Sequence, residues 1–180
     1  MTDVLFIQGA SEGAHEADAR LAASLARHLS AEYNLRYPQM PAEDDPRYAA
    51  WASTLAEELA AAESTFVLVG HSLGACLVLR YLALNAVKRE PVGVFLASAP
   101  FIGKRGWSDA EFELPTQAGT KLHKMRMFFY QGSADEVVPA AHLSLYEEAF
   151  PHATVRLLPA QNHQLDDDLS AIAADIRRLH

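Results

Sequence analysis

Three side chains of the kinds that together transfer acyl groups occur in this sequence, and the first is Ser72. It lies in the segment 70–74, Gly-His-Ser-Leu-Gly, directly after the apolar run 66–69 and directly before an apolar helical pattern. A strand, G-x-S-x-G and a helix in succession indicate a sharp turn that exposes the serine hydroxyl at the edge of a sheet. The first N–H groups of the helix would face a negative charge that develops there. The pentapeptide therefore predicts a nucleophilic serine, and a turn in which Ser72 only caps the helix is the alternative.

Asp135 and His163 supply the two other groups that such a serine needs. Asp135 lies in the segment 132–139, Gly-Ser-Ala-Asp-Glu-Val-Val-Pro, and His163 follows a later strand pattern. Neutral histidine is the base suited to removing a serine proton near pH 7, and a carboxylate fixes its tautomer and stabilises the imidazolium. The alternatives are a turn residue for Asp135 and a capping or surface residue for His163, with Asp109 as the reserve acid. We expect His71 to pack inside the turn rather than act as a base.

Six predicted strands have to position these residues. The apolar and alternating runs that predict them are 4–7, 33–37, 66–69, 92–96, 125–130 and 154–157. Each run is followed by a helix or a helix-sized segment, and this alternation implies a parallel sheet with right-handed crossovers and helices on both faces. Runs 33–37 and 154–157 alternate apolar with polar residues, so we expect them at the two edges. Because active residues gather at the carboxyl ends of parallel strands, Ser72, Asp135 and His163 should share one edge.

The helices are predicted by apolar stripes and by capping residues. They cover about 14–30, a stretch that starts at Asp45-Pro46, the segment after Ser72, a stretch that starts at Pro139, and a stripe from Leu165 to Leu179. Asp45 is the expected N-cap with Pro46 at the first helical position, and Asp166 to Asp168 are expected in the first turn of the last helix. Residues 99–120 show no period, and a loop this long is usually functional or mobile. We therefore predict one domain over 1–180, with loop 99–120 as a minimal lid.

Composition excludes several function classes. The chain has 180 residues, half of them hydrophobic, which suffices for one domain with a sizeable core. A formal net charge of −8 argues against nucleic acid or an anionic membrane surface as a partner. The single Cys76 allows no internal disulfide, no signal-peptide pattern opens the chain, and no apolar run approaches the length of a membrane span. A cytoplasmic protein is the expectation.

Nucleotide and metal sites are disfavoured by the residues themselves. The first loop, Gly-Ala-Ser-Glu-Gly over 9–13, is neither a dinucleotide fingerprint nor a P-loop, and Glu12 would repel phosphate. His163 with Asp166 and Asp167 is the one candidate group of metal ligands, and a helix start explains those acids better. We therefore expect no cofactor and no metal.

On segments 70–74 and 132–139 and on Asn162-His163, the chain resembles the α/β-hydrolases, and among them the small, nearly cap-less serine hydrolases of the YdeN and retinoblastoma-binding-protein type. The resemblance covers nearly the whole chain. It implies a shortened hydrolase fold, a three-layer αβα sandwich with a six-stranded parallel sheet of order 2-1-3-4-5-6. It also implies an oxyanion hole formed by the backbone N–H of Leu73 and an N–H of the first loop, most simply Ala10. The loop reads Gln8-Gly9-Ala10 where lipases and esterases often have His-Gly, so the second donor stays open.

The expected activity is that of a carboxylesterase-like serine hydrolase, which cleaves an ester or similar acyl bond of a small molecule through an acyl-serine intermediate. The alternatives are a non-catalytic binding module with the same fold, and an acyltransferase or thioesterase that uses the same serine. No oligomeric state is predicted. Candidates to line an acyl pocket, with ordinary packing as the alternative for each, are Met40, Phe101, Ile102, Trp107 and Leu114.

Overall fold

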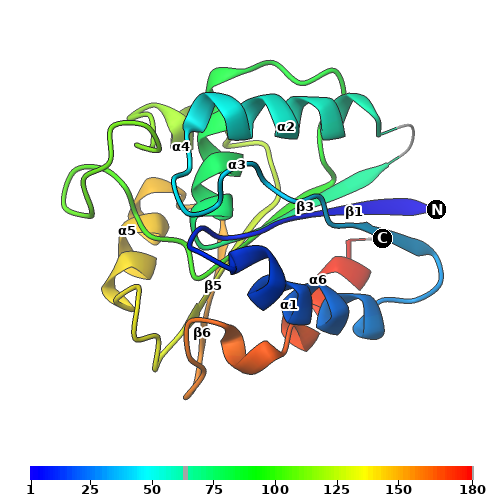
Figure 1. The fold of residues 1–180 in the computed structure, drawn as a ribbon. Helices are drawn as coiled ribbons and strands as arrows, with labels where there is room; N and C mark the ends of the chain where they lie inside the picture. The colour runs from blue at the N-terminus through cyan, green and yellow to red at the C-terminus, as the bar shows by residue number, and fades with distance from the viewer. Residues whose placement is uncertain (63–64, 180) are drawn as a thin grey trace.

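The apolar run that begins at Phe66 becomes the central strand of the sheet. A computed structural model, which describes residues 1–62 and 65–179, shows β3 (Phe66–His71) with every residue buried. β3 lies between β1 and β4 in a six-stranded sheet of order β2-β1-β3-β4-β5-β6, in which all neighbours are parallel (Figure 1). The predicted fold class and strand order are therefore confirmed.

The remaining strands lie close to their predicted positions. They are β1 (Thr2–Ile7), β2 (Tyr33–Arg36), β4 (Gly93–Ala97), β5 (Met127–Gly132) and β6 (Thr154–Leu158). No residue of β2 or β6 is fully buried, as expected for edge strands, whereas β4 is buried throughout. The register pairs Ile7 with Gly70 and Gly70 with Leu96, so neighbouring strands reach their carboxyl ends together.

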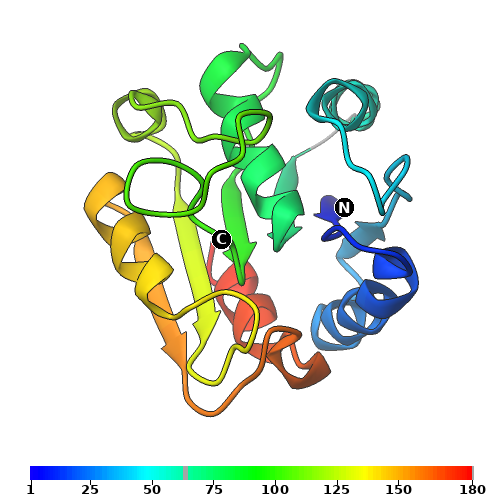
Figure 2. The same ribbon diagram turned by 60° about the vertical axis from the view of Figure 1, so that its left-hand side comes forward.

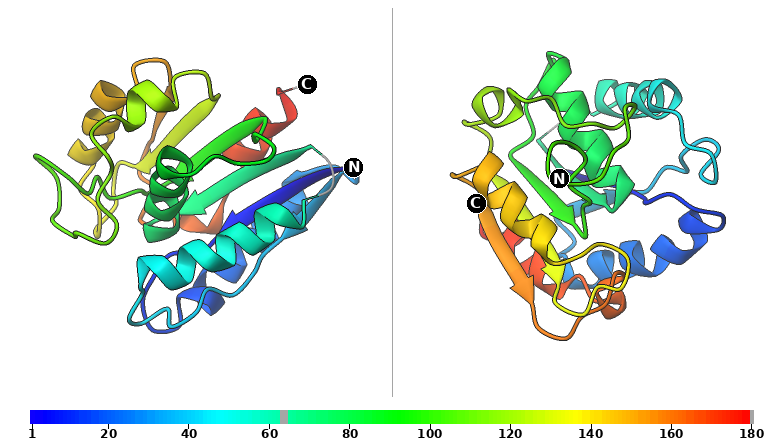
Figure 3. Two further views of the ribbon diagram at one scale, coloured as in Figure 1. Left: turned by 90° about the horizontal axis from the view of Figure 1, so that it is seen from above. Right: turned by 90° about the vertical axis from the view of Figure 1, so that its left-hand side faces the viewer.

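Helices cover both faces of the sheet and create two cores. They are α1 (Ala14–His28), α2 (Tyr48–Ala60), α3 (Leu73–Leu84), α4 (Ala118–Lys121), α5 (Ala141–Ala149) and α6 (Ser170–Arg177). Val67 and Val69 of β3 pack in one core with α1 and α6, and Leu68 packs in the other with α2, α3 and α5. Strands covered on both faces are apolar throughout, which explains the unbroken runs in the sequence. Figures 1 and 3 show the resulting three layers.

The carboxyl ends of the strands form one edge of the molecule, opposite both termini. Figure 1 shows β1 running away from the N-terminus at the right, and Figure 2 and the right-hand panel of Figure 3 turn the carboxyl-end side toward the viewer. The first loop, the turn after β3, and the loops after β4, β5 and β6 all leave the sheet at this edge. No helix among the described residues has the length and apolar character needed to cross a membrane.

The prediction for the start of the second helix is wrong by two residues. α2 begins at Tyr48 and follows Arg47, so Asp45 and Pro46 lie in the preceding loop. The N–H of Tyr48 donates to the carboxylate of Glu111 at 2.8 Å, which supplies the missing N-terminal partner. Glu111, 63 residues away, accepts an N–H that a local Asp N-cap would otherwise accept. The local capping pattern therefore misplaced the start of α2.

The prediction that Asp166 to Asp168 lie in the first turn of the last helix is also wrong. Residues Leu165–Asp167 form a short separate turn, η1, and all three have positive φ angles of 49–56°. α6 begins only at Ser170, whose N–H donates to Asp168 Oδ1 at 2.8 Å. The acidic run therefore precedes α6 rather than filling its first turn. The apolar stripe itself holds, because Leu165 and Ile172 pack in one core with α1.

Loop 99–120 is fastened to α5, and its last residues belong to α4 (Ala118–Lys121). Ile102 and Trp107 form an isolated bridge within it, and the N–H of Phe101 donates to Nδ1 of His142 at 2.8 Å. Arg105 contacts both carboxylate oxygens of Glu148, at 2.6 and 3.1 Å. These contacts hold the loop beside α5, whose residues pack on the β5 end of the sheet.

Candidate active site

Ser72 occupies a strained backbone turn between β3 and α3. Its φ of 51° and ψ of −122° are values that residues other than glycine rarely adopt, and they cost about 1–3 kcal/mol. Hydrogen bonds on both sides hold the turn: the N–H of Ser72 donates to the Ala97 carbonyl at 2.9 Å, and its own carbonyl accepts from the N–H of Ala75 at 3.0 Å. The end of β4 and the start of α3 thus fix a conformation that presents the Ser72 side chain at the carboxyl edge.

The two glycines of the pentapeptide allow backbone segments to approach closely. A Cβ on Gly70 would lie 2.7 Å from Cα of Ala75, and a Cβ on Gly74 would lie 2.6 Å from the Ile7 carbonyl oxygen. Both distances are far inside van der Waals contact, so α3 can pack against β3 and against the end of β1 only without these side chains. The G-x-S-x-G spacing therefore has a direct steric reason here.

The structure brings Ser72, Asp135 and His163 into contact from three separate loops. His163 Nε2 lies 3.2 Å from Ser72 Oγ, and His163 Nδ1 lies 2.9 and 3.1 Å from the two oxygens of Asp135. With its proton on Nδ1, the imidazole donates to the carboxylate and leaves Nε2 free to accept the serine hydroxyl proton. This is the geometry that general-base activation of a serine requires.

The Asp135 carboxylate is held by donors besides the imidazole. The N–H groups of Val137 and Val138 donate to its Oδ1 at 2.8 Å each, and Nε2 of Gln131 donates to its Oδ2 at 2.6 Å. The side chain has no exposed surface. Asp109, the reserve acid, instead accepts the N–H groups of Glu111 and Phe112 within its own loop.

The surroundings of His163 favour its neutral form. Burial lowers the pKa of the His163 imidazole below its ordinary value of 6.5, and the nearby His71 lowers it further, while Asp135 acts in the opposite direction. A lowered pKa keeps Nε2 unprotonated at neutral pH, as a base must be.

The first loop passes directly beside Ser72. A Cβ on Gly9 would lie 3.1 Å from the Ser72 Cβ, and Ala10, the next residue, lines the same hollow as Ser72. Within 1–62 and 65–179, no hydrogen bond engages the backbone N–H of Ala10 or that of Leu73. Two unengaged donors near one hydroxyl are what an oxyanion hole needs.

Gln8, which directly precedes Gly9, anchors that loop. Its buried side-chain Nε2 donates to Glu43 at 2.7 Å, and its Oε1 accepts from the His15 ring at 2.7 Å and from the N–H of Met40 at 3.1 Å. Glu43 also accepts the N–H groups of Gly13 and His15 at the start of α1. The loop after β1 is therefore tied to the loop after β2 through one amide and one carboxylate.

A hollow of about 220 Å³ opens beside Ser72. Its lining consists mainly of small residues from the first loop and α1, with the end of β3 and the loops after β5 and β6: Gly9, Ala10, Ser11, Ala14, Ala17, Asp18, His71, Ser72, Val137, His163 and Gln164. The residues expected to line an acyl pocket lie elsewhere. Met40 and Ile102 are buried in the core, Phe101 and Leu114 pack at its margin, and Trp107 is 41% exposed on its loop.

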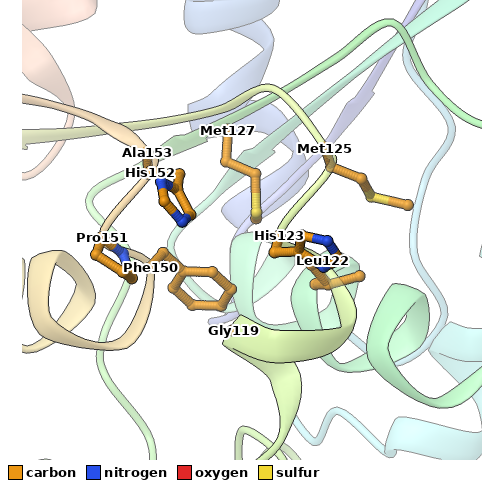
Figure 4. Close-up of a pocket in the computed structure, with 9 residues that line it drawn as sticks. All are labelled: Gly119, Leu122, His123, Met125, Met127, Phe150, Pro151, His152 and Ala153. Atoms are coloured by element: carbon orange, nitrogen blue, oxygen red, sulfur yellow. The ribbon is translucent and has the colours of Figure 1, made fainter.

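A second, much smaller cavity lies near the amino ends of β5 and β6, away from Ser72. Figure 4 shows its lining, in which the Met127 side chain and the Phe150 ring point into one space. Its volume of about 10 Å³ is near the minimum that one water molecule needs. Among the described residues, no group of three or more His, Cys, Asp or Glu side chains is arranged to hold a metal ion.

Sequence reasoning missed Asp18. Its side chain is buried between α1 and the site, with Oδ2 lying 2.8 Å from Nδ1 of His71. A usable signal was present, because Asp18 interrupts the apolar stripe of α1 at the spacing Ala14, Asp18, Leu21, Leu25, whose members are all buried. An acid on the buried face of a helix requires a partner.

Comparison with known proteins agrees with this architecture. A protein-family model described as serine hydrolase matches residues 15–168. Among solved structures, the ydeN gene product from Bacillus subtilis superimposes with a TM-score of 0.74 at 19% identity, over 99% of this chain and 97% of that one. The esterase domain of a Rhodothermus marinus protein gives 0.67 at 16% identity, over 98% and 86%.

A meta-cleavage product hydrolase from Pseudomonas fluorescens gives a TM-score of 0.77 at 12% identity, over 99% of this chain and 90% of that one. At these identities the likeness shows the fold, which is that of the α/β-hydrolases. No curated protein sequence matches the chain significantly.

Proposed function

The chain belongs to the serine hydrolase family, and from this premise we propose that it cleaves a carboxylic ester or similar acyl bond through an acyl-serine intermediate on Ser72. One observation carries the proposal: the His163 imidazole lies 3.2 Å from Ser72 Oγ on one side and 2.9 Å from Asp135 on the other. A base between a hydroxyl and a buried carboxylate is the arrangement that activates serine.

In the first half of the reaction, Ser72 Oγ attacks the substrate carbonyl carbon while His163 Nε2 takes the hydroxyl proton. Asp135 holds the imidazole in the correct tautomer and stabilises the imidazolium. The N–H groups of Leu73 and Ala10 donate to the carbonyl oxygen as it becomes negative, and each such donor is worth about 10²–10³-fold in kcat. The tetrahedral intermediate collapses, the C–O bond to the alcohol breaks, and the alcohol leaves with the proton from His163.

The second half repeats these steps with water. His163 Nε2 takes a proton from a water molecule, the resulting hydroxide attacks the acyl carbon, and the same two N–H groups stabilise the oxyanion. Collapse breaks the bond to Ser72 Oγ, which recovers its proton from His163, and the carboxylic acid is released. The chain's own residues supply every proton transfer in this cycle.

The hollow beside Ser72 supports a small substrate. Its volume of about 220 Å³ is below the roughly 300–1,000 Å³ of sites that hold drug-sized ligands. Ala14 and Ala17 on α1 form part of its wall and leave room for a short group next to the reacting carbonyl. We therefore propose esters with a short acyl or alcohol chain as the substrate class.

Turnover of p-nitrophenyl acetate by the wild type and by Ser72→Ala tests the proposal. We expect the substitution to lower kcat by several orders of magnitude and to leave the melting temperature almost unchanged, since the hydroxyl is not part of the hydrophobic core. Wild-type turnover in Ser72→Ala would refute the proposal. A large loss of stability would instead favour a capping role for Ser72.

A further inference from the structure

A buried carboxylate and a buried imidazole lie behind the proposed catalytic residues. Asp18 on α1 and His71 at the end of β3 are each 1% exposed, and Oδ2 of Asp18 lies 2.8 Å from Nδ1 of His71. Neither residue is needed for the proton transfers between Ser72, His163 and Asp135. A buried acid and base inside an active site call for an explanation besides general stability.

Each member of the pair also bonds to a backbone group of the site. The same Oδ2 of Asp18 accepts the N–H of Gly9 at 2.7 Å, and Gly9 directly precedes Ala10, the proposed oxyanion donor. Nε2 of His71 lies 3.1 Å from the carbonyl oxygen of His163. The pair thus joins the first loop, the end of β3 and the loop after β6.

This inference rests on the proposed function: we propose that Asp18 and His71 are positioning residues. A doubly protonated His71, paired with Asp18, fixes the main chain of His163 and the first loop, with its Ala10 N–H, in position relative to Ser72. Both ring nitrogens of His71 face acceptors, a carboxylate oxygen at Nδ1 and a carbonyl oxygen at Nε2. Only the imidazolium carries a proton on each nitrogen, so the contacts assign the charged form.

The charges around His71 agree with this assignment. Burial lowers the pKa of His71, but the Asp18 carboxylate, the His163 carbonyl and, least of the three, Asp135 raise it, and the pKa stands above its ordinary value. Burial likewise disfavours the charged form of Asp18, yet His71 and the Gly9 N–H leave its pKa lowered. The two shifts describe one ion pair.

The charge on His71 has a consequence for the base. The rings of His71 and His163 lie 5.0 Å apart, and a positive His71 opposes protonation of His163. The pair therefore acts on the reaction in two ways, by fixing two groups in space and by keeping His163 neutral. Misplacement of a reacting group by 1 Å costs about 10²-fold in rate, so the positioning effect is measurable.

Asp18→Asn tests the proposal by removing the charge and keeping the shape, and Asp175→Asn is its matched control. Asp175 is also a buried carboxylate in a side-chain network, with Arg156 and the Tyr130 hydroxyl, and it does not border the hollow beside Ser72. Kinetics are measured with p-nitrophenyl acetate between pH 5 and 8, at a temperature where circular dichroism shows each protein folded.

We expect Asp18→Asn to lower kcat by about 10–100-fold with a smaller change in KM, and to move the midpoint of the pH–rate limb upward because a neutral His71 no longer opposes protonation of His163. Asp175→Asn should keep the wild-type kcat and midpoint even if its melting temperature falls. A folded Asp18→Asn with wild-type kcat and midpoint would overturn the proposal.

A second measurement needs no substitution at the pair. In the ¹⁵N-labelled wild-type protein at pH 7.5, the imidazole nitrogen chemical shifts should show one histidine with both ring nitrogens protonated and shielded from titration. This measurement can be made whether or not the Asp18→Asn variant folds. If His71 carries a single ring proton, the proposal is overturned. Fluorophosphonate labelling of wild-type Ser72 separates the two ideas: its absence contradicts the hydrolase mechanism, whereas the nitrogen shifts test the ion pair independently.

Discussion

Replacing Asp135 by asparagine changes which nitrogen of His163 carries the proton. Oδ1 of Asp135 accepts the N–H groups of Val137 and Val138 at 2.8 Å, so the amide oxygen of an asparagine takes that position. Its NH₂ group then replaces Oδ2, which lies 2.9 Å from Nδ1 of His163. Because NH₂ can only donate, the 2.9 Å contact favours Nδ1 as the acceptor and a proton on Nε2, where it blocks transfer from Ser72. A proton kept on Nδ1 would have only the 3.1 Å contact to the amide oxygen, which already accepts two N–H groups.

The size of the loss follows from this tautomer. A carboxylate-to-amide change that leaves the histidine in the wrong tautomer lowers kcat by about 10⁴-fold, or about 5.4 kcal/mol at roughly 1.36 kcal/mol per factor of ten. Gln131 Nε2, which donates to Oδ2 at 2.6 Å, would also face an NH₂ group. We therefore expect the free energy of unfolding to fall by about 1–3 kcal/mol, while the two backbone donors retain their acceptor and the fold persists.

The assay is kcat and KM for p-nitrophenyl acetate between pH 5 and 8, with folding followed by circular dichroism. The residual activity of Asp135→Asn should rise with pH at a lower midpoint than in the wild type, because the charge that favours imidazolium is gone. Asp109→Asn is the control, since Asp109 bonds to Glu111 and Phe112 within its loop and should behave as wild type. A rate for Asp135→Asn within tenfold of wild type would refute the reasoning.

Three further predictions concern the base, the elbow and the hollow. Wild-type kcat/KM should rise with pH along one limb with a midpoint below pH 6.5, because burial and His71 lower the pKa of His163 and activity needs the neutral imidazole. A flat profile from pH 5 to 8 in folded protein would exclude His163 as the base. Gly74→Ala should destabilise the protein by about 1–3 kcal/mol in urea titrations, since the new Cβ would overlap the Gln8 carbonyl, and an unchanged midpoint would contradict that packing. Ala17→Leu should lower kcat/KM for p-nitrophenyl butyrate more than for p-nitrophenyl acetate. Equal losses for the two esters would place the acyl chain of the substrate outside this hollow.

The sheet and the three candidate catalytic residues were predictable because their signals are local. An unbroken apolar run predicts a strand covered on both faces, and β3 and β4 are such runs. The strand-turn-helix setting of Ser72 lies within one segment, and parallel topology then brings Asp135 and His163 to the same edge. Side-chain identity and topology together therefore predicted that these three candidate residues would meet.

What sequence reasoning could not place depends on contacts between distant segments. Glu111 caps α2 from 63 residues away, and His71, the partner of the buried Asp18, lies 53 residues away from it, so no local spacing identifies either partner. The residues expected to line an acyl pocket do not border the hollow beside Ser72, for another reason. Large apolar residues such as Ile102 were natural candidates, but burial in the core stabilises them most, and the wall at Ser72 is formed by small residues of α1 and the first loop.

Trapping of the nucleophile tests the central claim most directly. The intact wild-type protein is treated with a fluorophosphonate probe, and the labelled peptide is identified by mass spectrometry beside Ser72→Ala and Asp109→Asn treated in the same way. We predict a single phosphonate on Ser72 in the wild type and in Asp109→Asn, and no label in Ser72→Ala. Unlabelled, folded wild-type protein, or equal labelling of Ser72→Ala, would contradict the account of Ser72 as the nucleophile.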